Sequence, residues 1–179
     1  MEKASADPLV TLVVAVDEDG AMGRESGGLP WRLPDEAAHF RAVCAGQWIL
    51  VGRGTYGEMD GWFTDHTALV LTHSGPSVKP PGRPVGSVAE AIATARAGGA
   101  RQLVVIGGAM VFAAALPSAG RLWFTRVHGH SGGDVFFPTV DWSQWREMSR
   151  LSHSADDCHA HAFTIHGFER IEPPPASQP

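Results

Sequence analysis

Glu36 is the residue of this sequence whose position most suggests proton chemistry. It follows a glycine-rich segment that ends in Leu-Pro-Trp at Trp31, and it lies near the start of a helix expected over Pro34–Ala45. A carboxyl group on the inner face of that helix, next to apolar Phe40, would be partly desolvated, which raises its pKa and suits proton transfer near neutral pH. The simpler alternative is that Asp35 and Glu36 only favour a helix N-terminus through its dipole.

Two further segments place glycines between a strand and a helix. Strand Trp48–Val51 leads into the sequence Gly-Arg-Gly-Thr, residues 52–55, where free N–H groups and an arginine suit an anion. Strand Arg101–Ile106 leads into Gly107-Gly108, and glycine lets a backbone approach a ligand closely. The second segment is not the GxGxxG fingerprint. An ordinary turn, or close packing of helix on sheet, remains the alternative for each.

Thr125 lies in a third kind of setting, an apolar strand expected over Arg121–Val127. Alternation puts Trp123, Thr125 and Val127 on one face, and a hydroxyl among apolar neighbours needs a partner, which a buried carboxylate would supply. The alternative is a strand-forming residue whose hydroxyl bonds to backbone. Asp134 follows in a glycine turn, where its carboxylate could hold another loop in place.

The elements that must position these residues alternate between strand and helix, which predicts an α/β three-layer sandwich. The connection Asp17–Leu33 is long for a segment without secondary structure and is therefore a functional candidate. The segment His73–Pro84 is expected to be a loop, and Trp145–Ser152 and Ala160–Glu169 to form a closing antiparallel pair. Further strands are expected at Leu9–Val16 and Thr67–Thr72, and further helices at Arg53–Met59, Val88–Ala97 and Ala109–Leu116.

Composition narrows the class of protein. The 179 residues carry 14 basic and 19 acidic side chains, a formal net charge of −5, which disfavours general nucleic-acid binding. No apolar run approaches the ~20 residues of a membrane span, so a cytoplasmic protein is expected. The two cysteines suggest neither disulfides nor a metal site, and we expect no metal. We expect one domain over residues 9–170, a flexible arm over 1–8 and a disordered proline-rich tail over 171–179.

In order and spacing, these segments together resemble the dihydrofolate reductases, over about Leu9 to Arg170. The motifs are Leu-Pro-Trp with an acid five residues after the Trp, Val-Gly-Arg-Xaa-Thr-Tyr, Ile-Gly-Gly-Ala, and Thr-Arg-Val followed by Gly-Asp-Val-Phe-Phe-Pro. The resemblance implies an eight-stranded, mostly parallel sheet with an antiparallel C-terminal strand. It also implies NADPH-dependent reduction of 7,8-dihydrofolate to 5,6,7,8-tetrahydrofolate by a monomer that binds antifolates.

The resemblance also assigns roles to residues. Glu36 would bond the pterin and promote protonation at N5 while hydride reaches C6, with Trp31 holding a water and Thr125 bonding Glu36 and pterin. Asp17–Leu29 would be a gating loop latched by Asp134, and Gly107-Gly108 a cis peptide. The substrate residues implied are Val13, Val14, Leu29, Glu36, Ala37, Phe40, Met59, Ile106 and Thr125. The cofactor residues implied are Ala15, Met22, Gly52, Arg53, Gly54, Thr55, Thr72, His73, Ile106, Gly107, Gly108, Ala109, Met110, Val111 and Phe112.

Several positions depart from the family pattern. His66 stands near the place of the arginine that would bind the folate α-carboxylate, and no arginine lies between Arg53 and Arg83. Loss of that charge-assisted pair costs about 1.5–3 kcal/mol, or about ten- to a hundredfold in affinity. Phe112 replaces a common tyrosine, whose missing hydroxyl should slow hydride transfer modestly, and Met110 replaces an arginine.

The remaining departures concern the cofactor and inhibitors. His73 follows Thr72 where the family often has a serine, so NADPH preference would rest mainly on Arg53. The stretch from Gln47 to Arg53 resembles plasmid-type, antifolate-tolerant members, which predicts weak trimethoprim binding. Two alternatives stay open: a related NADPH-dependent reductase of another pterin or a riboflavin-pathway pyrimidine, and a catalytically silent ligand-binding relative.

Overall fold

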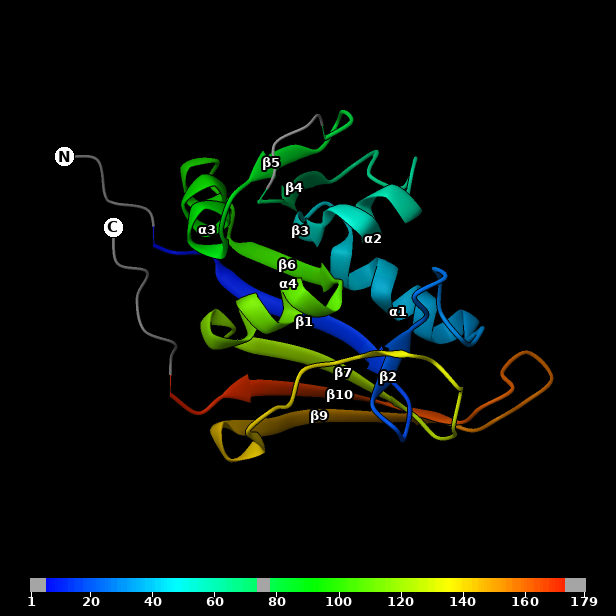
Figure 1. The fold of residues 1–179 in the computed structure, drawn as a ribbon. Coiled ribbons are helices and arrows are strands. Elements are labelled where there is room, and N and C mark those ends of the chain that lie inside the picture. Colours follow the sequence, from blue (N-terminus) through cyan, green and yellow to red (C-terminus); the bar gives the residue numbers. More distant parts are fainter. Residues whose placement is uncertain (1–5, 74–77, 173–179) are drawn as a thin grey trace.

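The computed structural model describes residues 6–73 and 78–172. Within this part an eight-stranded sheet has the order β5-β4-β3-β6-β1-β7-β10-β9 (Figure 1). Its strands are β1 (Leu9–Val16), β3 (Trp48–Gly52), β4 (Thr67–Leu71), β5 (Arg83–Val85), β6 (Gln102–Gly107), β7 (Arg121–Val127), β9 (Trp145–His153) and β10 (Phe163–Arg170). The helices are α1 (Pro34–Cys44), α2 (Arg53–Glu58), α3 (Val88–Ala97) and α4 (Ala109–Ala115), with the 3-10 turns η1 (Leu116–Ser118) and η2 (Trp142–Gln144).

The strand pairing confirms the expected topology. The six strands from β5 to β7 pair in parallel, and β10 runs antiparallel to both β7 and β9. Parallel strands bring their carboxyl ends to one edge of the sheet, where ligands bind in α/β folds. Asp17, Gly52 and Gly107, which end or follow β1, β3 and β6, therefore lie at the same edge.

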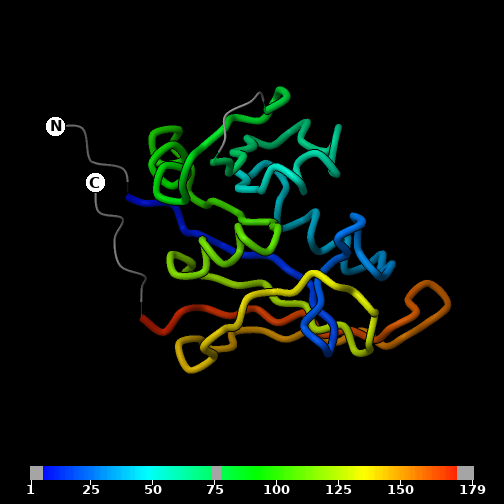
Figure 2. The backbone as a smooth tube through the Cα atoms, viewed as in Figure 1, coloured from blue at the N-terminus to red at the C-terminus, as the bar shows by residue number. Residues whose placement is uncertain are grey.

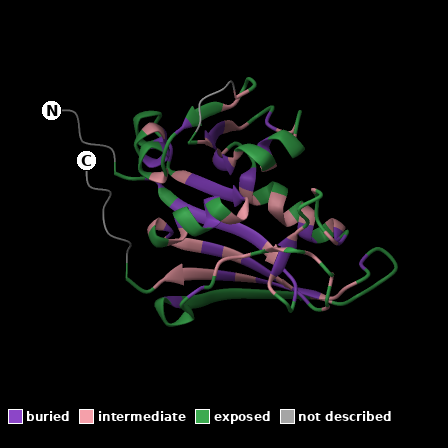
Figure 3. Ribbon diagram, viewed as in Figure 1, coloured by how far each residue is buried: buried purple, intermediate pink, exposed green. Residues whose placement is uncertain are grey.

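Helices cover both faces of the sheet, as alternation along the strands requires. On one face Leu12 and Val14 pack in a core cluster with α3 and α4 residues such as Ile92 and Phe112. On the other face Val13 packs with Cys44 of α1 and with neighbours from α2. In Figure 1, α4 lies in front of the middle strands. The middle strands are buried and β9 is exposed along most of its length (Figure 3).

Two segments expected to lack secondary structure contain strands. The connection 17–33 includes β2 (Ala21–Gly23), which pairs antiparallel with β8 (Val135–Phe136) in a separate two-stranded sheet. Figure 2 shows the chain after β1 lying beside the chain after β7 as a result. Part of the loop expected over 73–84 likewise enters β5, beginning at Arg83. These strands are two or three residues long, too short to show an apolar period in the sequence.

The chain ends lie partly outside the described residues. Of the expected arm 1–8, residues 1–5 are outside, whereas Pro8 is buried and Asp7 pairs with Arg96 at 2.9 Å. Of the expected tail, residues 173–179 are outside. Both cysteines are free, with Cys44 buried and Cys158 exposed. Within the described part, no helix has the length and apolar character needed to cross a membrane.

Candidate active site

Glu36 is a buried carboxyl group at the start of α1. The residue is 5 % exposed, and Thr125 Oγ1 donates a hydrogen bond to its Oε1 at 3.2 Å. Burial raises the pKa of Glu36 because it penalises the charged form, and the Thr125 hydrogen bond opposes this in part. The sequence prediction that Glu36 faces inward, and that a buried carboxylate satisfies Thr125, is confirmed in its geometry.

The local sequence explains why Glu36 lies here. Pro34 begins α1, where its missing N–H costs nothing, and Asp35 and Glu36 occupy the first turn. Beneath the helix, β1 and β7 run in parallel with Ala15 opposite Thr125. Since alternate side chains share a face, Trp123, Thr125 and Val127 all project toward the α1 side, as the strand pattern predicts.

The apolar residues expected around Glu36 are brought together only in part. Val13, Ile106, Phe40 and Met59 pack in one cluster on the α1 face of the sheet. Val14, by contrast, packs on the opposite face with Met22 and Phe112, because neighbouring strand residues point to opposite sides. Its side chain therefore does not join the residues around Val13.

Three other predicted residues near α1 differ in exposure. Trp31 is buried with Ala15 and Trp123, and its Nε1 has no hydrogen-bond partner among the described residues. Ala37 is half-buried on α1, whereas the side chain of Leu29 is 57 % exposed on the connecting loop. Only Trp31 of these three therefore offers a buried polar group beside the apolar cluster.

The two glycine segments lie side by side at the carboxyl ends of β3 and β6. A Cβ added at Gly52 would come 3.0 Å from Val111, and one added at Gly108 would come 3.4 Å from Thr55 Oγ1. The peptide between Gly107 and Gly108 is cis, as the resemblance implies, and Gly107 has a φ of +118°, which favours glycine. Neither α2 nor α4 has a side-chain N-cap, so backbone N–H groups at both starts remain available to a ligand.

The other predicted cofactor residues near this pair of turns differ in how far they are exposed. Ala109 is half-buried, and Val111 and Phe112 are buried in α4. Arg53 is exposed at the start of α2, and Met110 is 80 % exposed. Gly54 and His73 are exposed and Thr72 is half-buried. The arrangement brings together a bare backbone, a threonine hydroxyl and one arginine.

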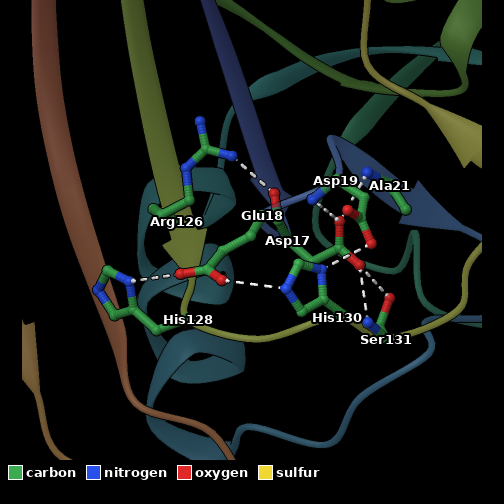
Figure 4. Close-up of polar contacts among 8 residues, drawn as sticks. All are labelled: Asp17, Glu18, Asp19, Ala21, Arg126, His128, His130 and Ser131. Carbon is green, nitrogen blue, oxygen red and sulfur yellow. Dashed lines mark hydrogen bonds and ion pairs between the residues drawn. The ribbon is translucent and has the colours of Figure 1, made fainter.

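The connection after β1 is anchored by Asp17, a residue that the sequence analysis did not single out (Figure 4). Its buried carboxylate accepts hydrogen bonds from the backbone N–H groups of Asp19 at 3.0 Å and Ala21 at 2.9 Å. It also accepts from the backbone of Ser131 at 2.9 Å and from Ser131 Oγ at 2.5 Å. Burial acts to raise the pKa of Asp17, but the hydrogen bonds from Ser131, Ala21 and Asp19 outweigh it and hold the pKa below its usual range.

The same anchor holds the backbone of the connection. Arg126 of β7 donates to the carbonyl oxygen of Asp17 at 2.6 Å, and Glu18 lies between His128 and His130 (Figure 4). Farther along, Asp134 Oδ1 accepts from the Glu25 backbone N–H at 2.8 Å, the contact expected of a latch. Asp17 and Ser131 are 114 residues apart in the sequence. No local sequence pattern therefore predicts the hydrogen bonds between them.

Two histidines sit in apolar surroundings near α1. His66 stacks on Trp62, with ring centroids 4.1 Å apart, and its side chain is 5 % exposed with Nδ1 3.0 Å from Asp65. His39 meets the edge of Trp123, and burial lowers its pKa. His39 was missed from the sequence, although it follows Glu36 by three residues on the same helix and hence lies on a neighbouring part of its face.

Comparison with known proteins places this fold and site in a family. The family model described as dihydrofolate reductase matches residues 9–170, so the chain belongs to the dihydrofolate reductase family. Dihydrofolate reductase type 3 of Salmonella typhimurium is 30 % identical, over 86 % of this chain and 93 % of its own. Dihydrofolate reductase 1 of Haloarcula marismortui is 32 % identical, over 94 % of this chain and 95 % of its own.

A solved structure agrees at the level of the fold. Dihydrofolate reductase from Enterococcus faecalis, complexed with NADP(H) and RAB-propyl, superposes with a TM-score of 0.83 at 28 % sequence identity. The match covers 92 % of this chain and 97 % of that one. The eight-stranded, mostly parallel sheet expected from the sequence is thus the fold of the family.

Proposed function

We propose that this chain catalyses the NADPH-dependent reduction of 7,8-dihydrofolate to 5,6,7,8-tetrahydrofolate. The observation that carries the proposal is the buried Glu36 carboxyl group, bonded by Thr125 on a chain that belongs to the dihydrofolate reductase family. The net reaction consumes one NADPH, one proton and one dihydrofolate, so the protein must bind two ligands and supply a path for a proton. Among the described residues, Glu36 is the buried acid on the α1 face of the sheet that could supply this proton path.

The residues at the two glycine turns fit NADPH. Side chains at Gly52 and Gly108 would fill the space between α2 and α4, which leaves bare backbone N–H groups for phosphate oxygens. Thr55 and Arg53 would add a hydroxyl and a positive charge, and the solved relative from E. faecalis is complexed with NADP(H). Bound there, the cofactor supplies the hydride that reduces C6 of the pterin.

Glu36 and its neighbours would bind and orient the pterin. The carboxyl group of Glu36 would bond the pterin amide and amino groups and favour a proton at N5. Thr125 would keep the carboxyl oriented, and the unpartnered Trp31 Nε1 would hold the water that delivers the proton. Val13, Phe40 and Ile106 would exclude other water from the ring.

Tail recognition and inhibitor binding would depart from the usual family pattern. His66 is buried against Trp62 and carries Asp65 beside it, so it presents no exposed cation to the folate α-carboxylate. Dihydropteroate, which lacks the glutamate tail, should therefore have a KM within about tenfold of that of dihydrofolate. A hundredfold higher KM would show that another residue binds the tail. We also propose that trimethoprim binds weakly, and an inhibition constant as tight as that of sensitive bacterial enzymes would contradict this.

The direct assay follows NADPH absorbance with dihydrofolate as the substrate. Turnover that requires both compounds supports the proposal. Reduction of a riboflavin-pathway pyrimidine or another pterin, without turnover of dihydrofolate, would contradict it. NADPH binding without hydride transfer to any of these substrates would identify a silent relative.

A further inference from the structure

A second cluster of ionisable side chains lies at the first turn of α1, outside the residues assigned to substrate and cofactor. It combines Asp35, in the first turn of α1, with His153 at the end of β9 and His159 in the connection to β10. One ligand atom from each lies within 4.8 Å of the others. Asp35 is exposed, His153 is half-buried and His159 is buried. Two regions that are far apart in the sequence, the start of α1 and the chain from the end of β9 to β10, thus converge on one point.

Hydrogen bonds fix the proton positions on both histidine rings. Nδ1 of His153 lies 2.6 Å from the carbonyl oxygen of Ser154, and because a carbonyl only accepts, Nδ1 carries the proton. Nε2 of His159 accepts the backbone N–H of Asp35 at 3.2 Å, so its proton is on Nδ1 and is donated to Asp156 Oδ1 at 2.8 Å. The Nε2 lone pair of His159 is therefore directed at the Asp35 backbone N–H, with Oδ2 of Asp35 3.9 Å from Nε2.

The atoms that face one another carry excess negative potential. Oδ2 of Asp35 lies 3.0 Å from Nε2 of His153 and 3.9 Å from Nε2 of His159. A second carboxylate oxygen, from Asp156, lies 3.8 Å from Nε2 of His153. Carboxylate oxygens and imidazole nitrogens thus converge within reach of one cation, and a single metal ion would contact Asp35 and both rings together.

We propose that Asp35 Oδ2, His153 Nε2 and His159 Nε2 bind a divalent metal ion of the zinc class. Two imidazoles and one carboxylate suit zinc and its neighbours in the first transition row, whereas magnesium and calcium prefer all-oxygen sets. Metal-binding histidines usually donate their other ring N–H to a carboxylate or a backbone carbonyl, and here the Asp156 carboxylate accepts from His159 and the Ser154 carbonyl accepts from His153. A water molecule would complete the tetrahedron.

The site would connect the first turn of α1 to the β9–β10 connection. Zinc on His159 Nε2 replaces the hydrogen bond from the Asp35 backbone, so occupancy acts on the residue that precedes Glu36. We expected no metal because the two cysteines lack a metal-binding spacing. His153 and His159 are six residues apart and Asp35 comes from another part of the chain, so no local spacing marks this cluster. The inference does not depend on the proposed reductase activity.

The test is a titration of the untagged, full-length chain with Zn²⁺ in competition with a chromophoric chelator, and with Co²⁺ followed by its visible absorption. We expect one saturable site with the strong absorption of tetrahedral Co²⁺, and a thermal midpoint that rises with Zn²⁺. His153→Gln and Asp35→Asn should each weaken Zn²⁺ binding by about a hundredfold, and Asp156→Asn by about ten- to a hundredfold.

Two control variants keep the result specific. His166→Gln removes a histidine–carboxylate pair of the same sheet, with Glu147 at 2.7 Å, and should leave Zn²⁺ affinity within about twofold. Cys158→Ser removes an exposed thiol next to His159 and should also leave it unchanged. The proposal is overturned if the wild-type chain shows no saturable site, if His153→Gln binds Zn²⁺ like the wild type, or if Cys158→Ser abolishes binding.

Discussion

Two buried carboxyl groups, one on α1 and one at the end of β1, have opposite electrostatic surroundings. Glu36 is 5 % exposed and accepts one described hydrogen bond, from Thr125. Asp17 is fully buried and accepts four, from Ser131 twice and from the Asp19 and Ala21 backbones. Burial raises the pKa of Glu36, whereas the four donors hold the pKa of Asp17 below its usual range despite its burial.

The difference shows that burial alone does not decide what a carboxyl group does. Asp17 has its donors built into the fold, so its charge is stabilised and it fastens the connection 17–33 to the chain after β7. Glu36 has one such donor among the described residues, three fewer than Asp17, which destabilises its charge and leaves its second oxygen for a ligand. A buried acid with few hydrogen-bond donors lowers the stability of the fold when it is ionised. Such a raised pKa fits a role in proton transfer.

The largest expected effect follows Glu36→Gln. Turnover of dihydrofolate should fall by about a hundredfold at neutral pH and by less at low pH, where solvent protons replace the lost group. The variant should also unfold at a higher temperature at neutral pH. The variant is more stable than the wild type because the raised pKa makes ionised Glu36 unfavourable in the folded state. This gain in stability should vanish below about pH 4.5, where Glu36 is neutral in both the folded and the unfolded state.

The control for this variant is Glu25→Gln, which changes an exposed acid of the connection and should leave turnover within about twofold. Steady-state rates and thermal midpoints across the acid and neutral range measure both effects. A Glu36→Gln variant with undiminished turnover at every pH would remove Glu36 from proton transfer.

Asp17→Asn should have the next largest effect and should act on stability. In this variant a side-chain NH2 group replaces one carboxylate oxygen and faces at least one of the four donors, from which it cannot accept a hydrogen bond. The free energy of unfolding should therefore fall by about 2 kcal/mol at neutral pH. The depressed pKa of Asp17 stabilises the fold above pH 3.8, its unperturbed value, and this contribution is lost as pH falls through the folded-state pKa. The deficit of the variant should therefore shrink in acid.

Urea unfolding at several pH values tests this expectation. Asp19→Asn is the matched control because its carboxylate is exposed and pairs with His130 at the surface. Equal stability of Asp17→Asn and the wild type at neutral pH would show that the four hydrogen bonds do not anchor the connection.

Thr125→Val should have a smaller effect on the same reaction. Removal of the described donor raises the pKa of Glu36 further and frees its carboxyl to rotate, which should lower kcat/KM by about tenfold. The pH profile should shift to higher pH, a change that loss of packing alone does not produce. Thr125→Ser keeps the hydroxyl and should restore the wild-type profile; failure to do so would point to packing instead.

Asp134→Ala should have the smallest effect. It removes one exposed hydrogen bond to the Glu25 backbone and should cost about 0.5–1 kcal/mol locally. We expect hydrogen exchange at the Glu25 amide to become faster in this variant and exchange in the buried strands to change little. Asp134→Asn retains an acceptor oxygen and should exchange more slowly than Asp134→Ala. Equal exchange in all three proteins would mean that the contact does not hold the connection.

Much of the architecture followed from sequence patterns. The unbroken apolar run of Leu9–Val16 predicted a strand buried on both faces, and an inward acid on α1 predicted a partner for Thr125. Strand alternation could also have separated Val14 from Val13, an inference that the family resemblance obscured.

The parts that sequence could not provide depend on contacts between distant residues. The anchor at Asp17 needs Ser131, and β2 needs β8, whose two or three residues give no detectable period. The Asp35, His153 and His159 cluster likewise forms only when α1 packs beside the end of β9. Spacing along one segment carries no signal for any of these.

The most direct test of the contrast between the two acids is a carboxyl ¹³C NMR titration of the protein, with chelator present to keep metal from Asp35. The Glu36→Gln and Asp17→Asn variants assign the two resonances. We expect Glu36 to titrate above 4.5 and Asp17 below 3.8, their unperturbed values. Titration of Glu36 at or below 4.5, or of Asp17 above 3.8, would contradict this expectation.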